Sequence, residues 1–222
     1  MSLIDERVYI RQTDLISPAQ LTMPIYIVGA GSIGSWTALS LLKLGCQNII
    51  IADDDTVEIH NAGSQVYASF DEGKLKVEAL REKLPSLVEN SAHLTIVNRS
   101  VDPENIPQAA GIVIMAVDSI TVREQFFTRL KNSSRWFIDG RMGGNIVEVF
   151  TAKLDRQEDI EAYQKTLFPA SEASTIPCSA RSVVYNCFIM AGMITNIVAR
   201  IAKQKMVPTE LTVDLENFQM YS

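Results

Sequence analysis

The sequence predicts an α/β domain with a mostly parallel central sheet flanked by helices. Short apolar runs rich in branched residues alternate along the chain with segments of helical periodicity, which is typical of this fold class. A glycine-rich turn, GAGSIG, joins the first apolar run to the first helical segment. A chain of 222 residues with 47% hydrophobic content is long enough for one well-packed domain and too short for two. We therefore expect a single domain over residues 1–222.

The N-terminal half is expected to alternate between buried strands and helices. Residues 1–22 are polar and mixed, and are predicted to form an N-terminal arm with a short helix. The run MPIYIVGAG is typical of a buried parallel strand, because it is apolar and ends in glycine. Gly45 is expected to end the first helix as a C-cap. The expected elements are strands at 23–31, 48–53, 93–99 and 111–117, with helices at 33–44 and 71–84.

The C-terminal half predicts further strands and a long helix. Residues 155–177 are polar, and we expect a loop that crosses the domain there. The segment 179–203 predicts a central helix, because it is hydrophobic all round. The other expected elements are a helix at 120–132, strands at 135–140 and 145–154, and a closing strand within 210–221.

Composition excludes several function classes. The formal net charge is -6, so a broad nucleic-acid-binding face is not expected. Polar residues interrupt every apolar run well before twenty positions, and the charged N-terminus lacks a signal-peptide core, so neither a membrane span nor secretion is expected. Three cysteines without a CxxC pair argue against a disulfide framework or a structural zinc site, and favour a reducing cytoplasm.

The GAGSIG turn carries the first functional signal. Gly29 permits a tight turn, Gly31 lets the backbone approach a phosphate, and Gly34 lets the helix pack on the strand. Asp53 falls at the end of the second strand, where a carboxylate accepts hydrogen bonds from ribose hydroxyls. This spacing predicts nucleotide binding. Asp54, the next acid, is assigned only a solvated surface role.

Longer motifs resemble a known family. The stretch DDDTVEIHNAGSQ is similar to the signature of the ThiF/MoeB/HesA adenylyltransferases, relatives of the ubiquitin-activating enzymes. The segments YIRQ, GKLKVEALREKL, AVDSITVREQF and PCSARSVVYN resemble further family segments in the same order. The match runs from about Arg7 to Asp214, and it implies a Rossmann-like fold of the ThiF/MoeB type.

The resemblance implies ATP-dependent adenylation of a C-terminal carboxylate on a small ubiquitin-like or sulfur-carrier protein or a peptide. ATP and Mg²⁺ are the implied cofactors, and no structural zinc is expected. In the nucleotide and phosphate pocket, Asp55, Asn61 and Gln65 match polar family positions and Lys76 matches the phosphate-contacting lysine. Lys74 is a neighbour that is easily mistaken for it.

Three further residues match positions tied to catalysis. Asp118 matches the metal-associated aspartate, although an N-cap role for the following helix is the alternative. Arg11 matches an arginine that reaches into the partner's site in related dimers, which implies a homodimer. Cys178 matches a cysteine that takes part in a thioester or persulfide step in several relatives.

Two departures from the family pattern leave alternatives open. Ser64 stands where the family usually has a phosphate-contacting arginine, and the family's paired cysteines are missing. Arg141, expected beside a flexible turn, is the candidate to replace the missing charge. A non-catalytic ATP-binding scaffold is therefore one alternative. An NAD-dependent oxidoreductase is another, but it gives no reason for the acidic, asparagine and lysine positions.

Overall fold

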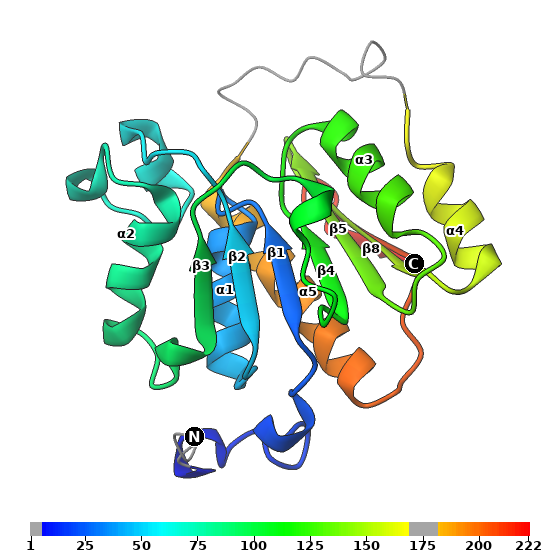
Figure 1. Cartoon of the computed structure of the whole chain (residues 1–222), viewed down its shortest axis with the longest axis horizontal. Helices are drawn as coiled ribbons and strands as arrows, with labels where there is room; N and C mark the ends of the chain where they lie inside the picture. The colour runs from blue at the N-terminus through cyan, green and yellow to red at the C-terminus, as the bar shows by residue number, and fades with distance from the viewer. Residues whose placement is uncertain (1–5, 169–181) are drawn as a thin grey trace.

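A single eight-stranded sheet runs through the molecule, with helices on both faces (Figure 1). The computed structural model describes residues 6–168 and 182–222. The strand order is β3-β2-β1-β4-β5-β6-β7-β8. The strands are β1 (Ile25–Val28), β2 (Ile49–Ala52), β3 (Leu94–Val97), β4 (Ile112–Met115), β5 (Trp136–Gly143), β6 (Ile146–Lys153), β7 (Glu210–Asp214) and β8 (Gln219–Tyr221). The α-helices are α1 (Gly34–Leu44), α2 (Lys76–Lys83), α3 (Ile120–Leu130), α4 (Gln157–Gln164) and α5 (Val184–Ala202).

The predicted parallel arrangement is confirmed for the first five strands. Ile25 of β1 pairs in parallel with Ile49 of β2 on one side and with Ile112 of β4 on the other. The pairs β2–β3 and β4–β5 are also parallel. Because strand side chains alternate between faces, Ile27 joins a core beneath α1, α2 and α5. Tyr26 joins the opposite core, beneath α3 and α4.

The other half of the sheet is an antiparallel meander that the sequence patterns did not reveal. β5 pairs with β6, β6 with β7 and β7 with β8, all antiparallel. β5 extends to Gly143 rather than ending at 140, because Gly144, with φ +58°, makes the tight turn into β6. The closing segment holds two strands, β7 and β8, rather than one.

The expected crossover loop at 155–177 is wrong in its first part, because α4 occupies Gln157–Gln164. This helix buries only Ile160 and Tyr163, so its polar composition concealed the helical period. The remainder of that segment, 169–177, lies outside the described residues.

The longest helix, α5, packs against the core with one face and exposes the other. It packs on α1, β5 and β6, which agrees with the expected central helix, while Tyr185, Phe188 and Asn196 on its other face are exposed. By length and composition α5 is the one helix among the described residues that is able to cross a membrane, with a mean hydropathy of 1.4. Of that window 56% is buried, which is equally typical of the core helix of a soluble protein.

The N-terminal segment contains two 3₁₀ turns, η1 (Glu6–Tyr9) and η2 (Pro18–Gln20). The Gln12 side-chain amide donates to the Leu44 carbonyl at 2.7 Å, and the Gln47 amide donates to the Pro18 carbonyl at 2.8 Å. The segment is therefore fixed at the C-terminal end of α1 and at the start of β2, at the opposite end of the sheet from the glycine turn.

Candidate nucleotide-binding site

The order in which strands are added to the sheet reverses at β1, which creates a topological switch point. After β1 the chain adds β2 and β3 on one side, then returns to place β4 on the other side. The loops that leave β1 and β4 therefore diverge. Ligands of open α/β sheets bind in the crevice that this divergence leaves at the carboxyl ends of the strands. The GAGSIG turn follows β1 at that crevice.

The three glycines of the turn differ in how closely other atoms approach them. Gly29 has φ +97°, and a Cβ there would lie 2.7 Å from the Ala116 carbonyl oxygen. A Cβ on Gly34 would lie 1.9 Å from the Gly29 carbonyl oxygen, so only glycine allows this close approach. A Cβ on Gly31 would meet nothing within 4 Å. The loop is thus tightly packed at both ends and open at its centre, where a phosphate would approach.

Asp53 lies at the end of β2 and is bound to the glycine turn. Its Oδ2 accepts the Ala30 N–H at 2.6 Å, and its Oδ1 accepts the Asp55 N–H at 2.8 Å. The residue is 7% exposed, and desolvation raises the pKa of its carboxyl against the lowering effect of the Ala30 N–H and of Lys76. Each oxygen still has acceptor capacity, so the carboxylate can also bind ribose hydroxyls.

The other two acids differ in their surroundings. The Asp55 carboxylate lies 2.6 Å from the Lys76 ammonium, an ion pair in which the lysine side chain is largely buried. Lys74 instead pairs with Glu82 at 2.6 Å, on the exposed side of α2. The structure therefore separates the two lysines and places Lys76 next to the acidic run. Asp54 is exposed, and one of its carboxylate oxygens lies within 4.8 Å of one oxygen of Asp53 and one of Asp55.

Asn61 and Gln65 belong to the turn η3 (Ile59–Gly63) and its exit. The buried Asn61 accepts the Glu58 N–H on Oδ1 at 2.9 Å, so it fixes the loop as well as bordering the site. Its backbone carbonyl accepts the Gln65 N–H at 2.9 Å. The Gln65 Oε1 is buried without a hydrogen-bond partner among the described residues.

A chain of hydroxyls, which sequence reasoning missed, connects the glycine turn to the start of α5. Ser32 Oγ lies 3.2 Å from Ser64 Oγ and 2.9 Å from Ser182 Oγ, and Ser182 Oγ lies 3.6 Å from Cys187 Sγ. The Trp36 indole donates to the Ser64 carbonyl at 2.8 Å. Ser64 thus binds the glycine turn at the position where the family usually carries arginine. The sequence feature that pointed toward these hydroxyls is Ser32, the serine inside GAGSIG.

Asp118 is exposed just after β4, and it does not cap the following helix. Ser119 is the N-cap of α3, because its Oγ accepts the Val122 N–H at 3.3 Å. Among the described residues Asp118 is not part of a cluster of three or more potential metal ligands. The only such cluster there is the acidic run, Asp53 to Asp55. The capping alternative for Asp118 is therefore wrong, and its assignment to a metal stays a prediction.

Arg141 lies within β5, not beside a flexible turn, and it is committed to a buried network. Asp139, fully buried, accepts from Arg123 Nε at 2.7 Å, from Arg141 Nε at 2.8 Å and from the Tyr163 hydroxyl at 2.9 Å. Burial lowers the pKa of Arg141, but Asp139 and Tyr163 raise it more, so the guanidinium stays charged. Its remaining bonds go to Thr166. These contacts indicate that Arg141 stabilises the fold, and they give no support to a role in binding phosphate.

Two predicted catalytic residues are not brought together with the others. Arg11 is exposed in the N-terminal segment, which packs at the far end of α1. Cys178 lies outside the described residues. Of the other cysteines, Cys46 has its pKa raised to about 12 by burial, and burial also raises the pKa of Cys187.

The residues present fit a nucleoside triphosphate. The open space at Gly31 and the Asp53 carboxylate beside the glycine turn are the observations that carry this fit. The acid cluster next to Lys76 offers oxygen ligands of the kind that Mg²⁺ prefers.

Comparisons with known proteins agree with this geometry. The model of the ThiF family matches residues 19–222. Escherichia coli (strain K12) tRNA threonylcarbamoyladenosine dehydratase is 33% identical over 101 residues, covering 43% of this chain and 37% of that protein. The crystal structure of SeMet PaaA matches with a TM-score of 0.77 and 20% identity, over 100% of this chain and 73% of that one.

The crystal structure of E. coli MccB with ATP matches with a TM-score of 0.69 and 17% identity, over 92% of this chain and 64% of that one. At these identities the two structures show a shared fold. The chain spans less than half the length of the curated relatives that it matches. Since the family model covers most of the sequence, the chain belongs to the ThiF family.

Proposed function

We propose that this protein adenylates a carboxylate with ATP. The acceptor carboxylate attacks the α-phosphate, a new P–O bond forms to the carboxylate oxygen, and the bond to the β-phosphate oxygen breaks. Pyrophosphate leaves with that electron pair, and the product is an acyl-adenylate. The observation that carries the proposal is the glycine turn, open at Gly31 and flanked by Asp53 and by the Asp55–Lys76 pair.

Each residue has a proposed part in that reaction. The loop N–H groups at Gly31 and the start of α1 bind phosphate oxygens, since a helix N-terminus favours an anion. Asp53 accepts from the ribose, and Lys76 offsets phosphate charge as it develops on the leaving group. Asp118 and the acidic run would hold Mg²⁺, which supplies neutralisation of the triphosphate when bound.

The proposed acceptor is the free C-terminus of a small ubiquitin-like or sulfur-carrier protein or of a peptide. The relative named a tRNA threonylcarbamoyladenosine dehydratase makes a carboxylate on a modified tRNA the alternative. The net charge of -6 opposes a broad tRNA-binding face, so the protein or peptide acceptor is favoured. We place the reaction in the cytoplasm, in keeping with three cysteines that form no CxxC pair.

The proposed assembly is a homodimer in which Arg11 of one protomer serves the site of the other. Arg11 is exposed and far from its own glycine turn, and α5 exposes Tyr185 and Phe188. Sedimentation is expected to show a dimer at micromolar concentration. Mixing Arg11→Ala with Asp118→Ala subunits is expected to restore activity, because one hybrid site regains both groups. A monomer, or no restoration, contradicts this assembly.

Isotope exchange between pyrophosphate and ATP tests the proposed reaction against its alternatives. The adenylation reaction predicts exchange that depends on an acceptor carboxylate. An oxidoreductase predicts NAD binding without exchange, and a non-catalytic scaffold predicts ATP binding without exchange for any acceptor. Cys178→Ala is expected to leave exchange intact, because adenylation needs no thiol.

A further inference from the structure

Three serine hydroxyls meet beside the glycine turn. Ser32 directly follows Gly31 in the turn, Ser64 is the C-cap of η3, and Ser182 lies shortly before α5. Ser182 Oγ donates to Ser32 Oγ at 2.9 Å, across 150 positions of the chain. Ser32 Oγ also lies 3.2 Å from Ser64 Oγ, and none of the three residues is fully buried. Segments that are remote in the sequence thus bring three hydroxyls next to the open centre of the turn.

The hydrogen bonds of this cluster leave the proton of Ser32 available. A serine hydroxyl donates one hydrogen bond and can accept two. Ser182 uses its proton on Ser32, so Ser32 can accept from both neighbouring hydroxyls and still donate to a third group. The separation of 3.2 Å between Ser32 and Ser64 is longer than the usual O–H···O distance of about 2.7–2.8 Å. That contact is therefore weak, and a better acceptor would replace it.

The cations nearest to the turn are already engaged. The Lys76 ammonium is paired with Asp55 at 2.6 Å. The Arg141 guanidinium donates to the buried Asp139 at 2.8 Å. Ser64 stands where the family usually carries a phosphate-contacting arginine. Neutral hydroxyl donors are suited to take over part of that contact, because a hydrogen bond to an anion is about twice as strong as one between neutral groups.

The order of groups along the turn indicates which phosphates would reach Ser32. Asp53 accepts the Ala30 N–H at 2.6 Å, so a ribose bound to Asp53 lies at the start of the turn. Gly31, where a Cβ would meet nothing within 4 Å, comes next, and Ser32 follows. The α-phosphate is attached to the ribose and would approach Gly31. The β- and γ-phosphates would then extend toward Ser32 and the start of α1.

We propose that the Ser32 hydroxyl donates to the phosphates beyond the α-phosphate of the bound nucleotide, and that Ser182 is the positioning residue that orients it. The inference rests on the proposed nucleotide site and names a determinant of specificity within it. Because hydrogen bonds in a chain polarise one another, the bond from Ser182 makes the Ser32 hydroxyl a stronger donor. The pair thereby favours ATP over AMP.

Calorimetry with the full chain and Mg²⁺, without an acceptor, tests the contact of Ser32. Ser32→Ala is expected to weaken ATP binding about tenfold, the effect of a lost hydrogen bond to a charged group, and to leave AMP binding within about twofold of the parent. Undiminished ATP binding overturns the proposal. Equal losses for ATP and AMP also overturn it, because they would show a general disturbance of the turn.

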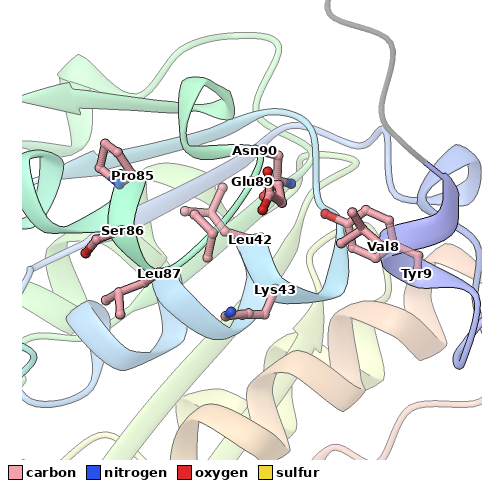
Figure 2. A pocket seen from close by; sticks show the side chains of 10 residues that line it. Val8, Tyr9, Leu42, Lys43, Pro85, Ser86, Leu87, Glu89 and Asn90 are labelled. Atoms are coloured by element: carbon pink, nitrogen blue, oxygen red, sulfur yellow. The ribbon is translucent and has the colours of Figure 1, made fainter.

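Ser86→Ala is the matched control. Ser86 is exposed, its Oγ donates to the Lys83 carbonyl at 2.8 Å, and it follows α2 at the end remote from Lys76. Figure 2 shows Ser86 at a pocket that Leu42 and Lys43, in the last turn of α1, also line. The glycine turn precedes the other end of that helix. Ser86→Ala is therefore expected to bind ATP and AMP as the parent does.

A double variant tests the positioning role of Ser182. Ser182→Ala is expected to weaken ATP binding about threefold in the parent and to have no further effect in Ser32→Ala, because Ser182 acts through Ser32. Equal effects in both backgrounds would overturn its assignment. ATP binding needs no turnover, so a parent that binds ATP without pyrophosphate exchange contradicts adenylation alone. A parent that binds no ATP contradicts the nucleotide site and this inference together.

Discussion

The Lys76 ammonium lies 2.6 Å from the Asp55 carboxylate, so two residues assigned separately from the sequence form one ion pair beside the glycine turn. Asp55 is mostly exposed while Lys76 is largely buried, so the pair holds the buried lysine at the edge of the acidic run. This arrangement orients the cation, and the proposed adenylation depends on that cation acting on phosphate.

Lys76→Gln is expected to lower the rate of adenylation by about 100-fold or more, because a charge directed at the phosphates is removed. Lys74→Gln is the matched control, since Lys74 lies two positions earlier and pairs with Glu82 on the exposed side of α2. Single-turnover adenylation rates of the two variants provide the measurement. Equal rates for both variants would remove Lys76 from the site.

Asp118→Ala is expected to abolish adenylation while ATP binding and stability persist. Stability is expected to change by less than about 0.5 kcal/mol, because Ser119 rather than Asp118 caps α3. Ser119→Ala, by contrast, is expected to cost about 1 kcal/mol of unfolding free energy. Urea unfolding and ATP calorimetry check both statements. An Asp118→Ala variant that adenylates at the parental rate would contradict its assignment.

If Asp53 binds the ribose as proposed, nucleotide affinity is expected to depend on pH. Desolvation raises the pKa of Asp53 in the folded protein, so folding favours the protonated form. Its contribution to stability is present below the ordinary pKa of 3.8 and is lost as pH rises through the raised value. Ribose hydroxyls bind the ionised carboxylate, so nucleotide affinity is expected to fall as pH drops through that raised pKa. Asp53→Asn is expected to weaken ATP binding by about 1–3 kcal/mol and to make the affinity less dependent on pH. Calorimetry over a range of pH measures both effects.

Asp139→Ala is expected to destabilise the fold by about 3–5 kcal/mol, because it leaves Arg123 and Arg141 without their buried partner. Asp14→Ala, at an exposed position, is the control and is expected to stay within about 0.5 kcal/mol of the parent. Urea unfolding measures both. A loss under 1 kcal/mol for Asp139→Ala would contradict the structural assignment of this network.

The sequence predicts most of the parallel half of the fold well, because three of its strands are largely buried on both faces and consist of continuous apolar runs. These strands are β1, β2 and β4. The short α4 was not predictable, since it buries only two residues in a polar segment. The antiparallel pairing of β5 to β8 depends on long-range register, which local patterns do not record.

The candidate site likewise contains residues whose positions local motifs predict and residues whose contacts they do not predict. Gly29, Gly34 and Asp53 act through local geometry and lie as the motif requires. Arg141 was assigned a phosphate or carboxylate role from an expected turn. In the structure its guanidinium instead donates to Asp139 and to Thr166. The contact of Ser64 with Ser32, 32 positions away in the chain, is a property of the folded state that no motif encodes.

Acceptor-dependent exchange of labelled pyrophosphate into ATP directly tests whether this protein adenylates a carboxylate. The purified chain is assayed with candidate protein or peptide acceptors bearing a free C-terminus, and with the same acceptors amidated at that end. Exchange with the free carboxylate, absent with the amide and lost in Lys76→Gln, is the predicted result. ATP binding without exchange for any acceptor, a modified tRNA carboxylate included, would contradict adenylation by this protein.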